Sequence, residues 1–235
     1  MMDKQLKYKE TDKMSDLICE NYTLLQVMSR FGLSLGFGDK TVKEFCLLNQ
    51  VDYRTFLAVV NFIDEGYLRM DDTFKELSVA SIMNYLKQAH SYFLDFNFPS
   101  IRLKLMEAIG YSEDNVTSLI MKFYDDYVDE VRKHMEYEDK VVFKYVEALL
   151  KGKLPTNYSI SVYAKKHTQV ETKLTELKNI IIKYYPAKSN NNLLNAALFD
   201  IFSCEQDLES HSRVEDYLFV PEVLKLVKKL SNSDE

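Results

Sequence analysis

The sequence has few of the residues that interrupt helices. Only 6 glycines and 4 prolines occur among its 235 residues, so it offers few positions for the turns that many short strands would need. Hydrophobic residues make up 46% and charged residues 28% of the chain, which is typical of a globular protein with a buried core. This composition predicts an all-α fold built from long helices.

Long hydrophobic runs are also missing. No apolar run approaches the roughly 18 residues that indicate a membrane span. The first residues, MMDKQLKYKETDK, lack the apolar segment of a signal peptide. We therefore expect no membrane association and a cytoplasmic location.

The charge balance and the cysteines argue against further classes. The net charge of −6 argues against nucleic-acid binding as a function, because phosphate contacts need a clustered basic surface. Residues 41–64 could pass for a helix-turn-helix but carry too few basic residues for DNA recognition. Cys19, Cys46 and Cys204 are too far apart for a disulfide framework or a Cys-x-x-Cys zinc frame. We expect all three to be reduced, small core residues.

Apolar periodicity divides the chain into two parts. Residues 1–72 hold short helical signals and are predicted to form a small N-terminal helical domain, whereas residues 73–235 have the pattern of long helices. In the first part, Gly32 is a candidate helix stop. Candidate N-caps of the next two helices are Asp39 or Thr41, and Asp52.

Four long helices are predicted for the second part. Their approximate spans are 75–109, 114–150, 159–185 and from 191 onward. Prolines indicate a kink in the first helix at Pro99 and a break in the last one at Pro221. Short connections favour antiparallel neighbours, and hence an up-down-up-down four-helix bundle.

Each predicted long helix carries one of the four histidines. These are His90, His134, His167 and His211. Their separations of 44, 33 and 44 residues indicate that the second pair of helices repeats the first. All four share a helix face with apolar residues, so we expect the imidazoles to point inward. Taken singly, each histidine has the simpler interpretation of a hydrogen-bonded core residue.

Two of the histidines begin the same frame, HMEYEDKVVF at 134–143 and HSRVEDYLFV at 211–220. His-x-x-x-Glu places an imidazole and a carboxylate about 40° apart on one helix face, so Glu138 and Glu215 should also point inward. Buried imidazoles and carboxylates are unfavourable unless something satisfies them. Two divalent cations would do so, and this set of nitrogen and oxygen donors suits iron.

The Glu-x-x-His frame of ferritin-like di-iron bundles is absent. The residues three places before the histidines are Lys87, Val131, Ala164 and Leu208.

At these residues the chain resembles the hemerythrin-like (HHE cation-binding) superfamily, and more specifically the bacterial di-iron proteins that repair damaged iron–sulfur centres. The resemblance implies two iron ions in an oxo- or hydroxo-bridged centre, with the two glutamates as bridges. The implied ligands are His90, His134, Glu138, His167, His211 and Glu215. Weaker candidates for orienting these ligands are Tyr163, Glu171, Cys204 and Asp207. Asp139 and Asp216, which follow the glutamates, are expected to be surface charges.

The stretch ICENYTLLQVMSRFGLSLGFGDKTVKEFC resembles the short domain that precedes the bundle in those repair proteins. That domain usually has adjacent cysteines, where this chain has Gly36 and Phe37. Thiol chemistry of such a pair is therefore not expected here.

The resemblance implies a redox or repair activity rather than a conventional enzyme. Damaged iron–sulfur proteins would be its partners and O2 or NO its small ligands, under nitrosative or oxidative stress. The alternative is a sensor that binds O2 or NO and acts through the N-terminal domain. A third interpretation is a metal-free helical interaction module. Any of these could act as a homodimer.

Overall fold

The computed structural model describes residues 6–65, 76–110, 115–156, 158–163, 172–185 and 191–232. Within these ranges the chain is helical and has no β-strand, apart from an isolated bridge between Lys13 and Thr41. The predicted all-α class is confirmed. None of the described helices combines the length and the apolar character that crossing a membrane requires.

The chain forms two compact units. The first comprises Met1–Ala89, Leu149–Leu154 and Arg213–Glu235, and the second comprises His90–Ala148 and Pro155–Ser212.

The first unit begins with four short helices. They are α1 (Met14–Glu20), α2 (Leu24–Arg30), α3 (Val42–Leu48) and α4 (Tyr53–Glu65). Thr41 caps α3, because its hydroxyl accepts from the Glu44 amide while the Glu44 carboxylate accepts from the Thr41 amide, at 3.3 and 2.9 Å. Asp52 accepts from the Thr55 amide at 2.6 Å at the start of α4. Gly32, just after α2, has a φ of 73°, which suits a glycine at a helix end.

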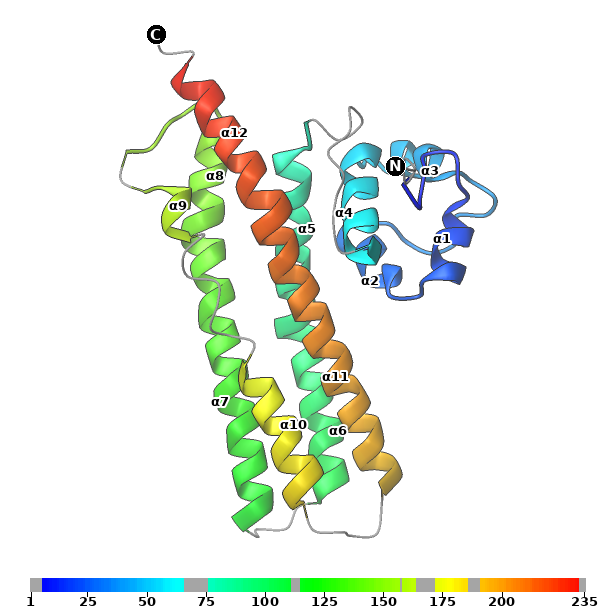
Figure 1. Cartoon of the computed structure of the whole chain (residues 1–235), viewed down its shortest axis with the longest axis vertical. Coiled ribbons are helices and arrows are strands. Elements are labelled where there is room, and N and C mark those ends of the chain that lie inside the picture. The colour runs from blue at the N-terminus through cyan, green and yellow to red at the C-terminus, as the bar shows by residue number, and fades with distance from the viewer. Residues whose placement is uncertain are drawn as a thin grey trace, which may run out of the picture. The chain divides into compact units, whose positions relative to one another are not determined.

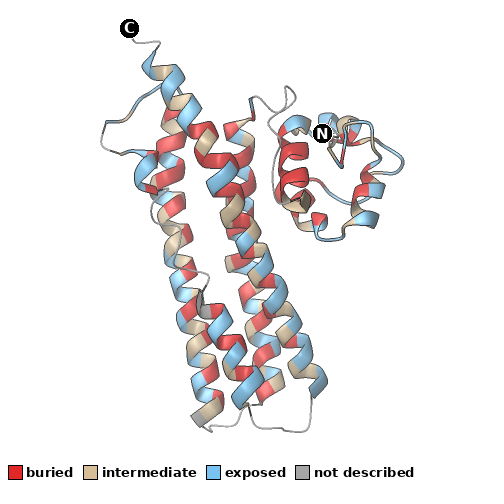
Figure 2. Cartoon of the chain, in the orientation of Figure 1, coloured by how far each residue is buried: buried red, intermediate tan, exposed pale blue. Residues whose placement is uncertain are grey.

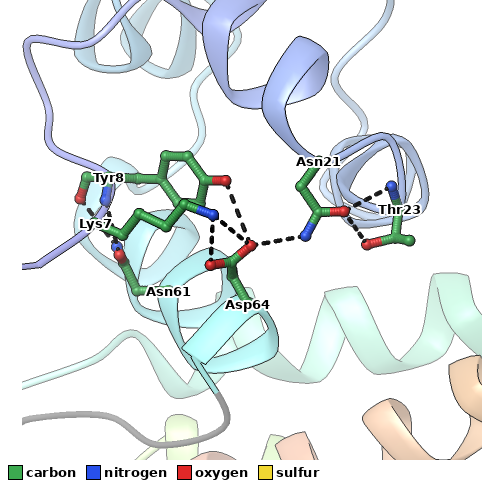
Figure 3. Close-up of polar contacts among 6 residues, drawn as sticks. All are labelled: Lys7, Tyr8, Asn21, Thr23, Asn61 and Asp64. Carbon is green, nitrogen blue, oxygen red and sulfur yellow. Dashed lines mark hydrogen bonds and ion pairs between the residues drawn. The ribbon is translucent and has the colours of Figure 1, made fainter.

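A polar network fastens the first described residues to α4 (Figure 3). The buried amide of Asn61 accepts from the Tyr8 backbone N–H at 2.9 Å and donates to the carbonyls of Tyr8 and Leu57 at 3.0 and 2.9 Å. One turn later, Asp64 accepts from the Lys7 ammonium and the Asn21 amide, both at 2.8 Å. The network replaces the water that these polar groups would otherwise bind.

The N-terminal helices also pack on the other elements of the first unit. Phe31 lies 5.1 Å from Tyr85 between ring centroids, on α5 (Val79–Ser91). Phe62 of α4 lies 6.0 Å from the ring of Tyr217, and the Arg213 guanidinium lies 5.2 Å from the Phe62 ring. These aromatic contacts join the N-terminal helices to segments that the sequence assigns to the bundle.

Four antiparallel helices with alternating directions make up most of the second unit (Figure 1). They are α6 (Phe98–Ile109), α7 (Asn115–Tyr137), α10 (Thr172–Tyr184) and α11 (Asn191–Val214). Two shorter helices are α8 (Phe143–Leu150), which continues the path of α7, and α9 (Ile160–Tyr163). The predicted helix 159–185 is thus described as α9 and α10, and its residues 164–171 lie outside the described part of the chain.

Ion pairs and packing close these four helices into a ring. The pairs are Arg102–Asp125 between α6 and α7, Lys104–Asp200 between α6 and α11, and Lys178–Glu205 between α10 and α11. Helix α10 also packs on α7. Buried residues lie along the inward faces of these helices (Figure 2). The predicted four-helix bundle with alternating helix directions is therefore confirmed.

The chain stays helical through both prolines, so the predicted break at Pro221 is wrong. Instead, a π-helical segment precedes each of them: η2 (Tyr92–Asn97) before Pro99, and η5 (Glu215–Phe219) before Pro221, which lies in the first turn of α12 (Val220–Ser231). Proline has no N–H and crowds the carbonyl four residues earlier. A π-helical turn accommodates both defects while the helix continues. A third segment, η3 (Glu138–Val142), is followed by a helix without proline, α8.

Candidate metal centre

Two of the predicted carboxylates occupy the same place in the helix geometry. Glu138 is the first residue of η3 and Glu215 the first residue of η5. Each follows a histidine by four residues, His134 at the end of α7 and His211 near the end of α11. Widened π-helical turns are frequent at functional sites. The repeated sequence frame thus corresponds to a repeated backbone feature.

The structure brings four of the predicted residues into one buried cluster. One nitrogen or oxygen atom from each of His90, Glu138, His211 and Glu215 lies within 4.8 Å of the others. The two glutamates are fully buried, and the two histidines are 2% and 3% exposed. The His90 and His211 rings are 5.1 Å apart between centroids. Two nitrogen and two oxygen donors therefore surround one small volume.

The carboxylate of Glu138 faces two different imidazoles. Its Oε2 lies 3.2 Å from Nε2 of His90, and its Oε1 lies 3.0 Å from Nε2 of His134. The buried Tyr163 hydroxyl donates to the same Oε1 at 2.8 Å. Tyr163 was a weak candidate in the sequence, and the structure places it directly against a predicted ligand. His134 is 24% exposed, so the side of Glu138 that it faces is nearer to solvent.

The position of the Asp139 side chain differs from the prediction. From its place one residue after Glu138, this side chain is expected to be a surface charge. Its Oδ1 lies 3.0 Å from Nδ1 of His90, although its side chain is 41% exposed. The prediction assumed that each residue turns about 100° from the one before it, whereas η3 begins at Glu138 and departs from that geometry. In the sequence, the only indication of a role for Asp139 is that an aspartate follows the glutamate in both frames, at 138–139 and 215–216.

Aromatic rings cover the cluster. Phe143 stacks on His90 with centroids 5.4 Å apart and an angle of 21°. Phe93 meets the His211 ring edge-on at 5.9 Å. Both phenylalanines are fully buried. In such an apolar, water-poor surrounding, the interaction between a cation and its carboxylates is stronger than in water.

The other predicted residues contribute less or cannot be placed. Cys204 is buried on α11, and Asp207 is partly exposed on the same helix. His167 and Glu171 lie outside the described residues. Their roles stay predictions from the sequence.

The cysteines only partly follow expectation. Cys46 and Cys204 are buried, as predicted for small core residues, but Cys19 is exposed on α1. Burial raises the pKa of the Cys46 thiol to about 12, so this thiol stays protonated and unreactive near neutral pH.

The chemistry of the cluster fits a transition-metal cation. Two buried carboxylates and two buried imidazoles are unfavourable in an apolar interior, and a divalent cation offsets this by binding the charged oxygens and the imidazole nitrogens. Imidazole and carboxylate donors together suit iron and related first-row metals.

The comparison with protein families agrees with this geometry. A model of the Hemerythrin HHE cation binding domain matches residues 81–223, more than half of the chain and all four residues of the cluster. The chain belongs to the hemerythrin HHE cation-binding family. A comparison with curated proteins finds no match. Family and cluster together define a metal-binding helical bundle.

Proposed function

We propose that this chain is a di-iron protein that repairs or protects iron–sulfur clusters under nitrosative or oxidative stress. The observation that carries the proposal is the carboxylate of Glu138, whose two oxygens face the imidazoles of His90 and His134. A carboxylate placed in this way can bridge two cations. The proposed ligands are His90, His134, Glu138, His167, His211 and Glu215.

The surroundings of the cluster support a redox role. A bound iron pair would supply one-electron chemistry and a coordination position for O2 or NO. The stacked Phe143 and the edge of Phe93 exclude water from His90 and His211. His134 is 24% exposed, so a small molecule from solvent would meet the centre on the side of this ligand. Because Gly36 and Phe37 replace the cysteine pair and Cys46 is buried, repair would rely on the metal centre and not on thiols.

The test combines a metal count with a repair assay. The chain purified under anaerobic, reducing conditions should contain about two iron ions, and it should restore an iron–sulfur enzyme that NO has inactivated. A matched His211→Ala chain should hold less iron and restore less activity. Absence of iron from the wild-type chain would end the proposal. Full iron loading without any restoration would eliminate the repair role.

A sensor is the second candidate, and a specific set of contacts favours it. Phe31 and Phe62 of the N-terminal helices contact Tyr85 on α5 and Arg213 and Tyr217 beside Glu215. A change at the metal centre would be transmitted to these aromatic contacts. A sensor should therefore show NO-dependent changes in amide hydrogen exchange in α2 and α4, whereas a repair protein needs none.

A further inference from the structure

Two consecutive residues hold the two nitrogens of one imidazole. Glu138 faces Nε2 of His90 at 3.2 Å, and Asp139 contacts Nδ1 of the same ring at 3.0 Å. Phe143 stacks on the face of the ring. The orientation of His90 is thus fixed by a contact at each nitrogen and by packing on its face.

The contact at Nδ1 determines which nitrogen can bind a cation. A neutral imidazole carries one N–H and one lone pair. The carboxylate of Asp139 accepts a hydrogen bond and cannot donate one when ionised, so it selects the form with the proton on Nδ1. The lone pair that a cation would need then lies on Nε2, 3.2 Å from the Glu138 carboxylate; without a cation, that carboxylate favours a proton on Nε2 as well. In metal sites, a carboxylate on the second nitrogen of a histidine ligand fixes its tautomer and raises its basicity.

We propose that Asp139 is a positioning residue of the cation site, which holds His90 in the Nδ1–H form with Nε2 directed at the cluster. The inference rests on the proposed metal-binding function and extends it to a residue outside the ligand set. In residues 134–139 the functional frame is then His-x-x-x-Glu-Asp, in which the aspartate acts on a histidine of another helix.

The partial exposure of Asp139 makes the inference testable. Its side chain is 41% exposed, so its replacement leaves no cavity in the core, and variants should fold. Asp139→Asn retains an oxygen that accepts from Nδ1–H, whereas Asp139→Ala removes the acceptor. Asp129→Ala is the matched control, because Asp129 is an exposed carboxylate on α7.

The first readout is the protonation of His90 in the full-length, metal-free chain, measured by nitrogen-15 NMR of the imidazoles. Nδ1 of His90 should carry the proton in the wild type, in Asp139→Asn and in Asp129→Ala. It should lose that proton wholly or partly in Asp139→Ala. An identical His90 signal in the wild type and Asp139→Ala would overturn the inference. This readout needs no iron, so it stands even if the repair or di-iron proposal fails.

The second readout is the affinity for Co2+, measured by competition with a chromophoric chelator. Asp139→Ala should weaken binding by about 10- to 100-fold, the usual range for such partners of metal ligands. Asp139→Asn should recover part of the loss, and Asp129→Ala should match the wild type. Unchanged affinity in Asp139→Ala would overturn the inference. So would an Asn variant as weak as the Ala variant, since the hydrogen-bond acceptor would then have no effect.

Discussion

Buried polar side chains serve different purposes among the N-terminal helices and inside the bundle. Asn61 and Glu138 are both fully buried. Asn61 bonds to backbone groups of Tyr8 and Leu57, so it joins two pieces of chain. Glu138 contacts side chains, namely those of His90, His134 and Tyr163.

Asn61 and Glu138 differ in what their partner groups can bind. Backbone N–H and C=O groups must be paired when they are buried. Asn61 pairs such groups through its side-chain oxygen, which accepts, and its side-chain NH2, which donates. Imidazole nitrogens and carboxylate oxygens can be paired, but they are also metal ligands. A buried amide therefore contributes stability, whereas a buried carboxylate among imidazoles provides a site. The following variants test this comparison, from the largest expected effect to the smallest.

Glu138→Ala should abolish metal binding, because it removes the two oxygens that face His90 and His134. The variant should lose nearly all of its metal after loading and desalting, as measured by mass spectrometry of the metal content. Glu136→Ala is the control, since this carboxylate pairs with Lys140 at 2.6 Å on the outside of α7. A Glu138→Ala chain that holds as much metal as the wild type would remove Glu138 from the site.

Asn61→Ala should destabilise the chain and leave the metal unaffected. The substitution deletes three buried hydrogen bonds, at about 1 kcal/mol each, so the free energy of unfolding should fall by roughly 3 kcal/mol. Urea denaturation of the metal-free chain measures this. The exposed Asn195 provides a control variant, Asn195→Ala, with little expected change. A loss of metal from folded Asn61→Ala would contradict the division of roles.

Tyr163→Phe should weaken metal binding without abolishing it. The change removes the hydroxyl that donates to Glu138 Oε1 at 2.8 Å and keeps the ring that fills the core. The affinity for Co2+ should fall roughly tenfold, at the lower end of the range for partners of metal ligands. Tyr22→Phe, at a tyrosine 78% exposed, should have no effect. If both variants bind equally well, the hydroxyl does not help to hold Glu138.

Much of the fold follows from local chemistry that the sequence displays. Scarce glycine and proline, together with apolar periodicity, are sufficient to predict the helical bundle. Thr41 and Asp52 were recognisable as N-caps because a hydroxyl or carboxylate before a helix pairs with its first amides. The inward placement of Glu138 and Glu215 followed from their spacing to His134 and His211.

The π-helical segments account for what the sequence did not show. Pro99 and Pro221 indicated a local disturbance, but not that the helix would absorb it in η2 and η5. No proline marks η3, where the change of helical geometry begins at Glu138 and Asp139 lies against His90. Predictions based on ideal helix angles fail at such turns. The part played by His167 and Glu171 stays a prediction, because neither residue is described.

The ion pair of Lys7 and Asp64 should give the N-terminal helices a small sensitivity to acid. Burial alone would raise the pKa of Asp64, but hydrogen bonds from Lys7 and Asn21 outweigh it, and the pKa lies below its usual value. The unfolded chain therefore binds a proton more readily, and the contribution of Asp64 is fully present above the ordinary aspartate pKa of about 3.9. It is lost as the pH falls through the lower pKa of the folded state.

Asp64→Asn should thus lower the free energy of unfolding at pH 7 by about 1 kcal/mol, the upper range for a pair that is partly exposed to solvent. The difference from the wild type should shrink as the pH is lowered below about 4, as measured by urea denaturation of metal-free chains at both pH values. Asp39→Asn is the matched control, because Asp39 pairs with Lys13 at 2.8 Å but is 92% exposed. Its effect should be smaller at either pH, since water screens the pair. If the difference in the free energy of unfolding between Asp64→Asn and the wild type increased as the pH was lowered, the predicted direction of the pH dependence would be wrong. This result would mean that burial of the Asp64 carboxylate outweighs its hydrogen bonds with Lys7 and Asn21, so that its pKa is raised on folding and not lowered.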